Sequence, residues 1–155
     1  MQLTKNFELD EFLHSDLADK KNISNLPSKT EEKEVYENLQ KLAIAMQALR
    51  DEFGRPIFIS SGFRSKKLNE LVGGVESSHH RLGLACDFYI SNISSNRALV
   101  EHISTILLSQ KIRFDQIIMY PKESFIHLSV ASTFRAECKI CKYGNNGKRV
   151  GYENL

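Results

Sequence analysis

The segment SSHHRLGLACDF, residues 77–88, contains the side chains best suited to chemistry in this chain. His80 offers an imidazole nitrogen and Asp87 a carboxylate oxygen, and both are common zinc ligands. A catalytic zinc ion usually takes three protein ligands and keeps one coordination position for water. A third donor is therefore needed, and His127 in the later segment FIHLSV is the best candidate.

The alternation of side chains in FIHLSV, residues 125–130, supports this choice. Successive residues of a strand point to opposite faces, and one face here is uniformly apolar and should contact the core. That face comprises Ile126, Leu128 and Val130. His127 then lies on the other face, and the same parity in LACDFYI, residues 84–90, puts Asp87 outward as well. Spacing alone leaves a purely structural role open, because a single histidine on a strand more often only forms hydrogen bonds.

Two amphipathic helices are predicted around these residues. The first has apolar side chains at spacings of three and four. They are Val35, Leu39, Leu42, Met46, Leu49 and Phe53. Ser28 or Thr30 can cap its start, Gly54 ends it, and Pro56 prevents its continuation. The second covers residues 94–111, with Ser94 or Ser95 as the expected cap.

Strands are predicted mainly in the second half of the chain. They are PIFIS (56–60), LACDFYI (84–90), FDQIIMYP (114–121), FIHLSV (125–130), and a last strand with an Asn-Gly turn in the tail 136–152. Helices come first and strands cluster late, which predicts an α+β fold: N-terminal helices packed on a small, mostly antiparallel sheet that carries the zinc site. A length of 155 residues suits one domain, residues 1–155, with residues 1–29 as an N-terminal helical extension packed on it.

Composition narrows the class of protein. An apolar content of 41% with mixed charges indicates an ordinary globule, and a net charge of +2 is too small to indicate nucleic-acid binding. No run is long enough to insert in a membrane, and no secretory signal is visible, so we expect synthesis in the cytoplasm. Three cysteines fit a reducing compartment better than a disulfide framework. We expect a monomer.

The stretch SHHRLGLACD, residues 78–87, matches the pattern Ser-x-His-x-x-Gly-x-Ala-x-Asp. This pattern resembles the signature of the zinc D-Ala-D-Ala metallopeptidases, a peptidoglycan-cleaving family that includes many phage endolysins. The resemblance continues in SGFRSKKLNELVGG, FDQIIMY, FIHLSV and the N-terminal NFELDEFLHSDLA, and it spans most of residues 5–150.

The resemblance implies roles for individual residues. It makes His80, Asp87 and His127 the ligands of one zinc ion. It assigns Arg64 to pairing with a substrate carboxylate, for which guanidinium offers a planar, always-charged fork, and Ser78 to holding the same end of the substrate. The implied function is hydrolysis of amide bonds in peptidoglycan stem peptides or cross-bridges by a phage or prophage lytic enzyme, which is released through a holin or carried on a virion.

The general base is the point where the chain departs from the family. The family has a Glu three residues before the last His, but that position is Ser124 here, and Glu123 lies one residue earlier. A straight strand would leave Glu123 about 13 Å from His127, so the turn must fold it back. Asp115 is the alternative base. This departure leaves a second interpretation open, a zinc-containing module that binds cell wall or peptide without cutting it. The sequence does not decide between an endopeptidase and a D,D-carboxypeptidase.

Overall fold

The computed structural model describes residues 1–130 and 133–155. The helices are α1 (Leu9–Leu13), α2 (Asp16–Lys20), α3 (Glu32–Phe53), α4 (Lys66–Leu71), the short 3-10 helix η1 (His79–Leu82) and α5 (Arg97–Ser109). The strands are β1 (Ile57–Ser61), β2 (Ala85–Ile90), β3 (Gln116–Tyr120), β4 (Phe125–Ser129), β5 (Glu137–Tyr143) and β6 (Arg149–Asn154). The predicted α+β fold is confirmed.

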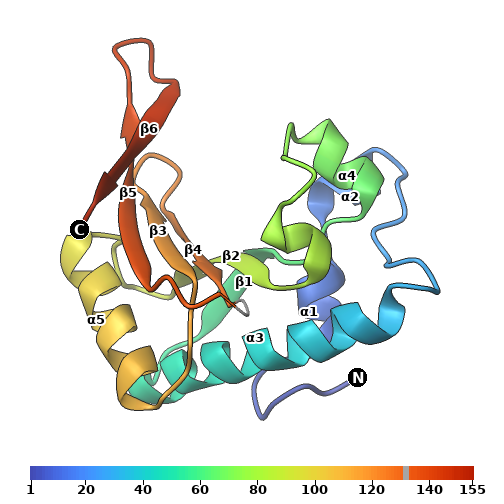
Figure 1. Ribbon diagram of the computed structural model, residues 1–155, viewed down its shortest axis with the longest axis horizontal. Helices are drawn as coiled ribbons and strands as arrows, with labels where there is room; N and C mark the ends of the chain where they lie inside the picture. The colour runs from blue at the N-terminus through green and yellow to red at the C-terminus, as the bar shows by residue number, and fades with distance from the viewer. Residues whose placement is uncertain (131–132) are drawn as a thin grey trace.

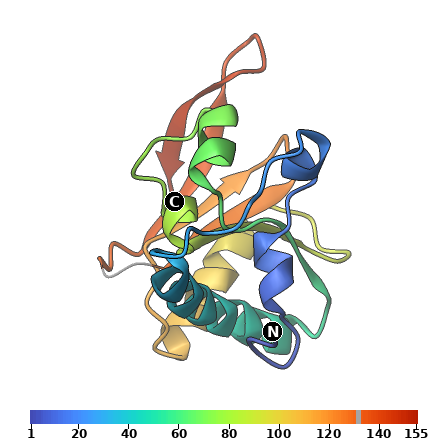
Figure 2. The same cartoon turned by 90° about the vertical axis from the view of Figure 1, so that its right-hand side faces the viewer.

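The strands form one sheet in the order β1-β2-β4-β3-β5-β6. All neighbouring pairs in this order are antiparallel except β3 and β5, which run parallel. Figure 1 shows α3 along the bottom of the molecule and α5 at one side, while α4 and the β5–β6 hairpin rise on opposite sides above the sheet. Figure 2 shows the same hairpin projecting beyond the rest of the chain.

Helix α3 confirms the predicted apolar stripe. Its buried side chains include Val35, Leu39, Leu42, Met46 and Leu49. They pack in one core with α5 and with the inner faces of the strands, to which the apolar residues of β4 also contribute. Gly54 ends α3 in the left-handed conformation, with φ of 60°, as a C-terminal glycine is expected to do.

The predicted caps of both long helices were wrong. The residue preceding α3 is Glu31, whose carboxylate contacts the hydroxyl of Ser28 at 2.6 Å. Asn96, and neither Ser94 nor Ser95, caps α5, because its side chain accepts a hydrogen bond from the backbone N–H of Leu99 at 2.9 Å. Ser94, Ser95 and Asn96 are all of a residue type that can cap a helix. The residue at which the first turn of α5 begins decides which of them does so.

The N-terminal segment packs on the loop that follows β1. Phe12 is fully buried in the main core. Asn25 is buried as well, and its amide donates to the carbonyls of Leu13 at 2.8 Å and Phe63 at 2.9 Å. Its side-chain oxygen accepts from the backbone N–H of Ser65 at 2.7 Å. One buried amide thus fixes the loop on both sides of position 64.

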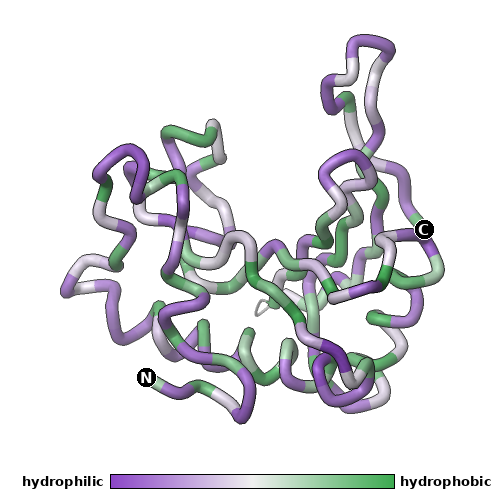
Figure 3. The backbone as a smooth tube through the Cα atoms, turned by 180° about the vertical axis from the view of Figure 1, so that it is seen from behind, coloured by the Kyte–Doolittle hydropathy of each residue, from purple (hydrophilic) through white to green (hydrophobic). Residues whose placement is uncertain are grey.

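The tail forms two strands where the sequence predicted one strand and a turn. The hairpin joins the sheet through β5, whose register against β3 begins at Gln116 opposite Glu137. In Figure 3 the tip of the hairpin is hydrophilic, whereas apolar stretches concentrate along the strands and helices of the body. None of the helices in the described part of the chain combines the length and apolar character needed to cross a bilayer.

Candidate metal centre and its cleft

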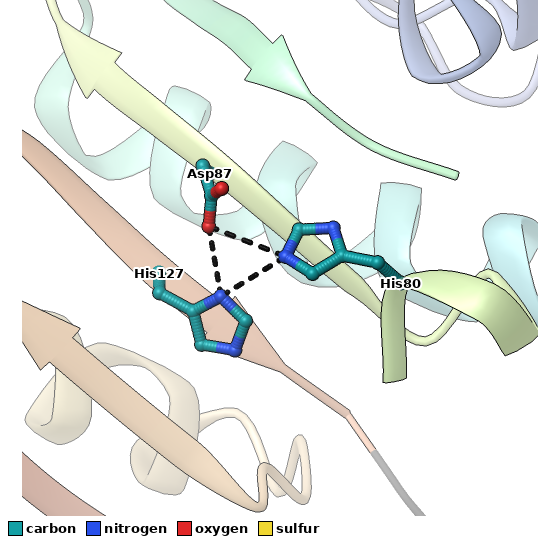
Figure 4. A group of neighbouring side chains, drawn as sticks. All are labelled: His80, Asp87 and His127. Atoms are coloured by element: carbon teal, nitrogen blue, oxygen red, sulfur yellow. Dashed lines mark hydrogen bonds and ion pairs between the residues drawn. The ribbon is translucent and has the colours of Figure 1, made fainter. Parts of the chain in front are cut away.

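His80, Asp87 and His127 converge on one point. One donor atom from each lies within 4.8 Å of the others. Nδ1 of His127 is 2.8 Å from Oδ1 of Asp87, and Nε2 of His80 is 3.4 Å from the same oxygen. The two imidazole nitrogens are 3.3 Å apart, and Figure 4 shows all three side chains turned toward one another. Two nitrogens and one carboxylate oxygen form a donor set that suits zinc.

Sheet register explains why two of the three donors meet. Asp87 on β2 and His127 on β4 are direct cross-strand partners, so their side chains leave the same face of the sheet. Their strand neighbours Cys86, Phe88, Ile126 and Leu128 are buried on the other face. The parity predicted for both strands is therefore confirmed, and the paired donors face away from the main core.

The third donor comes from the turn before β2. Helix η1 carries His80 and ends at Gly83, which has φ of 70°. A Cβ at position 83 would come within 2.9 Å of the carbonyl oxygen of Val35 on α3. Both the left-handed conformation and this close approach require glycine, which gives the glycine of the sequence pattern a physical reason.

The orientation of His80 depends on Gly62, which the sequence analysis did not single out. Nδ1 of His80 lies 2.7 Å from the carbonyl oxygen of Gly62, which can only accept a hydrogen bond. Donation from Nδ1 leaves the lone pair on Nε2, the nitrogen that faces Asp87. Gly62 itself lies against α1, since a Cβ there would be 2.3 Å from the carbonyl oxygen of Phe12.

The protonation states of the centre suit a cation. Burial lowers the pKa of His80, so its imidazole is neutral at neutral pH, the form that binds metals. Burial alone would raise the pKa of Asp87, but His80 and His127 outweigh it and lower that pKa far below the ordinary value. The centre thus holds an ionised carboxylate beside a neutral imidazole.

Arg64 contacts the centre from the side. Its Nη2 lies 3.2 Å from Oδ2 of Asp87, and its Nε donates to the hydroxyl of Ser61 at 3.2 Å. Oδ1 and Oδ2 of Asp87 therefore have different neighbours, the imidazoles on one side and the guanidinium on the other. The backbone of Arg64 is held by its own N–H, which donates to the carbonyl of His80 at 3.0 Å.

A cleft of about 930 Å³ opens over the centre. Its lining includes the three donors, Arg64 and Ser78, so the structure brings together the predicted ligands and both predicted substrate-binding residues. His79 also lines it, and the β5–β6 hairpin contributes Arg149. Neither His79 nor Arg149 was predicted at the site. The sequence pattern has no place for His79, and Arg149 reaches the cleft only through the long-range pairing of β5 with β3.

Glu123 does not line the cleft in the described part of the chain. It lies in the turn between β3 and β4, where Ser124 has φ of 58°. Its carboxylate accepts hydrogen bonds from Nε and Nη2 of Arg149 at 3.0 and 2.8 Å and from the hydroxyl of Tyr143. Although burial acts in the other direction, these two partners lower the pKa of Glu123, and a lower pKa makes it a weaker base.

Asp115, the alternative base, is fully buried beneath the cleft wall. Arg135 donates two hydrogen bonds to it, at 2.7 and 2.5 Å, and this pairing lowers its pKa. Nδ1 of His79 lies 3.7 Å from its Oδ2. Asp115 therefore reaches the cleft only through its neighbours His79 and Arg135, which both line it.

Two histidine nitrogens and one carboxylate oxygen beside an open cleft match the donor set of catalytic zinc sites, which take three protein ligands and leave one position for water or substrate. The sequence model of the peptidase M15 family matches residues 5–129. The chain therefore belongs to this family of zinc D-Ala-D-Ala peptidases, and the resemblance found in its sequence is confirmed. No curated protein was found to match the chain. Zinc peptidase is thus the class of the protein, and His80, Asp87 and His127 form a cluster whose donor atoms can hold the zinc ion.

Proposed function

We propose that the 155 residues act as one domain that hydrolyses amide bonds in peptidoglycan stem peptides or cross-bridges, as a phage or prophage lytic enzyme acting on the bacterial cell wall. The observation that carries the proposal is the position of Arg64, which lines the cleft beside the zinc ligands. Stem peptides end in carboxylates, and an always-charged guanidinium next to the centre can hold such an end and so position the peptide in the cleft.

The residues of the site have separate tasks in this proposal. His80, Asp87 and His127 would hold the zinc ion, which supplies Lewis acidity and a nucleophile available at neutral pH. Arg64 and Ser78 would bind the substrate carboxylate and so fix the amide in place. Glu123 is proposed as the general base, with Asp115 as the alternative. Glu123 would have to release Arg149 to take this role.

That last requirement favours a second candidate function. Both carboxylates proposed as bases are engaged by arginines, and neither lines the cleft in the described part of the chain. A module that binds cell-wall peptides through zinc and Arg64 without cutting them fits the same geometry. Endopeptidase, D,D-carboxypeptidase and non-cutting module differ in their products, so the products decide among them.

Digestion of purified peptidoglycan tests the proposal. Zinc-loaded protein should release soluble fragments, a chelator should stop the release, and added zinc should restore it. Mass spectrometry of defined muropeptides would then identify the bond that is cut. A zinc-loaded protein that sediments with peptidoglycan but releases nothing would contradict the hydrolase proposal and support the binding module.

A further inference from the structure

The β5–β6 hairpin forms a wall of the cleft that lies outside the part of the chain matched by the family. The match ends at residue 129, whereas Arg149 and Tyr152 lie on β6 and line the cleft. They adjoin Tyr120 of β3 and Phe125 of β4, whose rings stack with centroids 4.6 Å apart. The hydroxyls of Tyr120 and Tyr152 are 3.1 Å apart, so a hydrogen bond between two tyrosines joins β3 to β6 in the cleft.

The guanidinium of Arg149 lies over this aromatic surface. Its guanidinium carbon is 4.4 Å from the ring centroid of Tyr120, a distance typical of cation–π contact. Nε and Nη2 both donate to Oε1 of Glu123, and the side chain remains 49% exposed. For Nη1 no acceptor is found among the described residues, so one edge of the guanidinium is available to a ligand in the cleft.

Guanidinium groups outnumber carboxylates in the lining of the cleft, although each of them is paired with a carboxylate. Three arginines line it, Arg64, Arg135 and Arg149, and Asp87 is the one carboxylate residue in its lining within the described residues. Arg64 precedes α4 and Arg149 lies on β6, and Figure 1 shows these two elements on opposite sides of the molecule. A peptide that spans the cleft therefore meets a guanidinium on each side.

We propose that Arg149, held over the ring of Tyr120, is a second carboxylate-binding position that selects peptides with a carboxylate inside the chain in addition to the terminal one. The inference rests on the proposed function, because it takes Arg64 as the partner of the terminal carboxylate. The glutamyl α-carboxylate of a stem peptide is an internal carboxylate of this kind. A planar guanidinium with a free edge can donate hydrogen bonds to this carboxylate without leaving the aromatic surface.

The same contacts are also compatible with a purely structural role for Arg149. Its two hydrogen bonds to Glu123 tie the hairpin to the turn between β3 and β4, and losing them would loosen both segments. A loosened hairpin would slow the reaction of every peptide by the same factor. A carboxylate-binding role instead predicts that one class of peptide is affected, so a ratio between two peptides separates the roles.

The probes are the pentapeptide L-alanyl-γ-D-glutamyl-L-lysyl-D-alanyl-D-alanine and the same peptide with its glutamyl α-carboxylate converted to an amide. Both keep the terminal carboxylate that Arg64 would bind. Zinc-loaded wild-type protein, Arg149→Gln, Arg149→Lys and Lys148→Gln are compared by kcat/KM. Lys148→Gln is the matched control, since it removes one positive charge from the same hairpin at an exposed residue outside the cleft lining.

Wild-type protein and Lys148→Gln should prefer the carboxylate peptide about 10-fold, as expected for a charge-assisted hydrogen bond at a partly exposed site. Arg149→Gln should show a ratio near one, and Arg149→Lys a ratio in between, because lysine keeps the charge but not the fork. Each ratio is internal to one protein, so partial unfolding of a variant does not change it.

A wild-type ratio near one, or an unchanged ratio in Arg149→Gln, would overturn the inference while leaving the peptidase proposal intact. If the zinc-loaded protein cuts neither peptide, titration calorimetry with the same two peptides gives the ratio of binding constants instead. In that case the inference is supported if wild-type protein binds the carboxylate peptide more tightly than the amide peptide and Arg149→Gln removes this preference. It is contradicted if the preference is missing or if neither peptide binds. The proposed function itself fails only if the protein also releases nothing from purified peptidoglycan.

Discussion

Arg64 contacts Asp87 on the carboxylate oxygen that the imidazoles do not use, with Nη2 3.2 Å from Oδ2. Oδ1 of the same carboxylate is 2.8 Å from Nδ1 of His127. The proposed substrate-binding arginine therefore also orients a carboxylate that is proposed to bind zinc. Contacts of this kind fix the geometry of the metal-binding group and are commonly worth 10–100-fold in metal affinity.

The first prediction is that Arg64→Gln lowers zinc affinity about 10-fold, because the carboxylate of Asp87 loses the group that orients it. Competition against a chromophoric chelator measures the affinity, and Arg55→Gln, at an exposed residue outside the cleft, is the control. If Arg64→Gln binds zinc as tightly as the control, the guanidinium does not support the metal ligand, and its role is confined to substrate.

Gly62→Ala should weaken zinc binding through His80 rather than through Asp87. The new Cβ would lie 2.3 Å from the carbonyl oxygen of Phe12, so the backbone must move and the acceptor of His80 Nδ1 moves with it. We expect a loss of about 1–3 kcal/mol in the free energy of unfolding, as overpacking usually costs, together with weaker zinc binding. Denaturant unfolding and chelator competition measure the two effects. Unchanged zinc affinity in a destabilised variant would show that His80 does not need this carbonyl.

Zinc binding should weaken as the pH falls. Burial lowers the pKa of His80 below its ordinary value near 6.5, so the imidazole is neutral at pH 7 and protons compete for Nε2 only in the acid range. Asp87 stays ionised across this range because its pKa is lowered even further. Zinc titrations should therefore show full affinity at pH 7 to 8 and a progressive loss below about pH 6.5. The metal-free protein should lose stability in the same direction, since the unfolded chain binds the proton more readily. An affinity that is equal at pH 7 and pH 5 would contradict this account.

The general base is tested by comparing two substitutions. Glu123→Gln should abolish turnover and leave the zinc content unchanged, because Glu123 is not among the ligands. Asp115→Asn is the comparison, and it carries a stability cost because the buried carboxylate loses its ionic pairing with the half-exposed Arg135. Turnover is therefore compared at equal amounts of folded protein, measured by circular dichroism. Full activity in Glu123→Gln would shift the assignment to Asp115.

Local patterns in the sequence predicted the parts of the site that local geometry controls. Side-chain alternation placed His127 and Asp87 on the face away from the core, and the register of β2 against β4 pairs them directly. His80 was a candidate ligand by its residue type, and the resemblance to a known pattern assigned it to the site. The structure supplies the physical reason, since Gly83 allows the turn that brings His80 to the strand.

Long-range features of the site were beyond the sequence. The hairpin wall depends on parallel pairing between β3 and β5, which are separated along the chain by β4, and no local signal in the tail encodes that pairing. The position of Glu123 depends on a turn in which Ser124 adopts φ of 58°, an unusual conformation for a residue other than glycine. Both features were therefore found only with the three-dimensional structure.

The attachment of β5 to β3 has a consequence for solubility. Without residues 137–154, β3 would become an edge strand and would present unpaired backbone N–H and C=O groups next to Ile117 and Ile118. Exposed apolar edges of this kind pair with strands of other molecules. A chain shortened to the family-matched residues would thus be prone to self-association, and the hairpin protects the rest of the sheet from it.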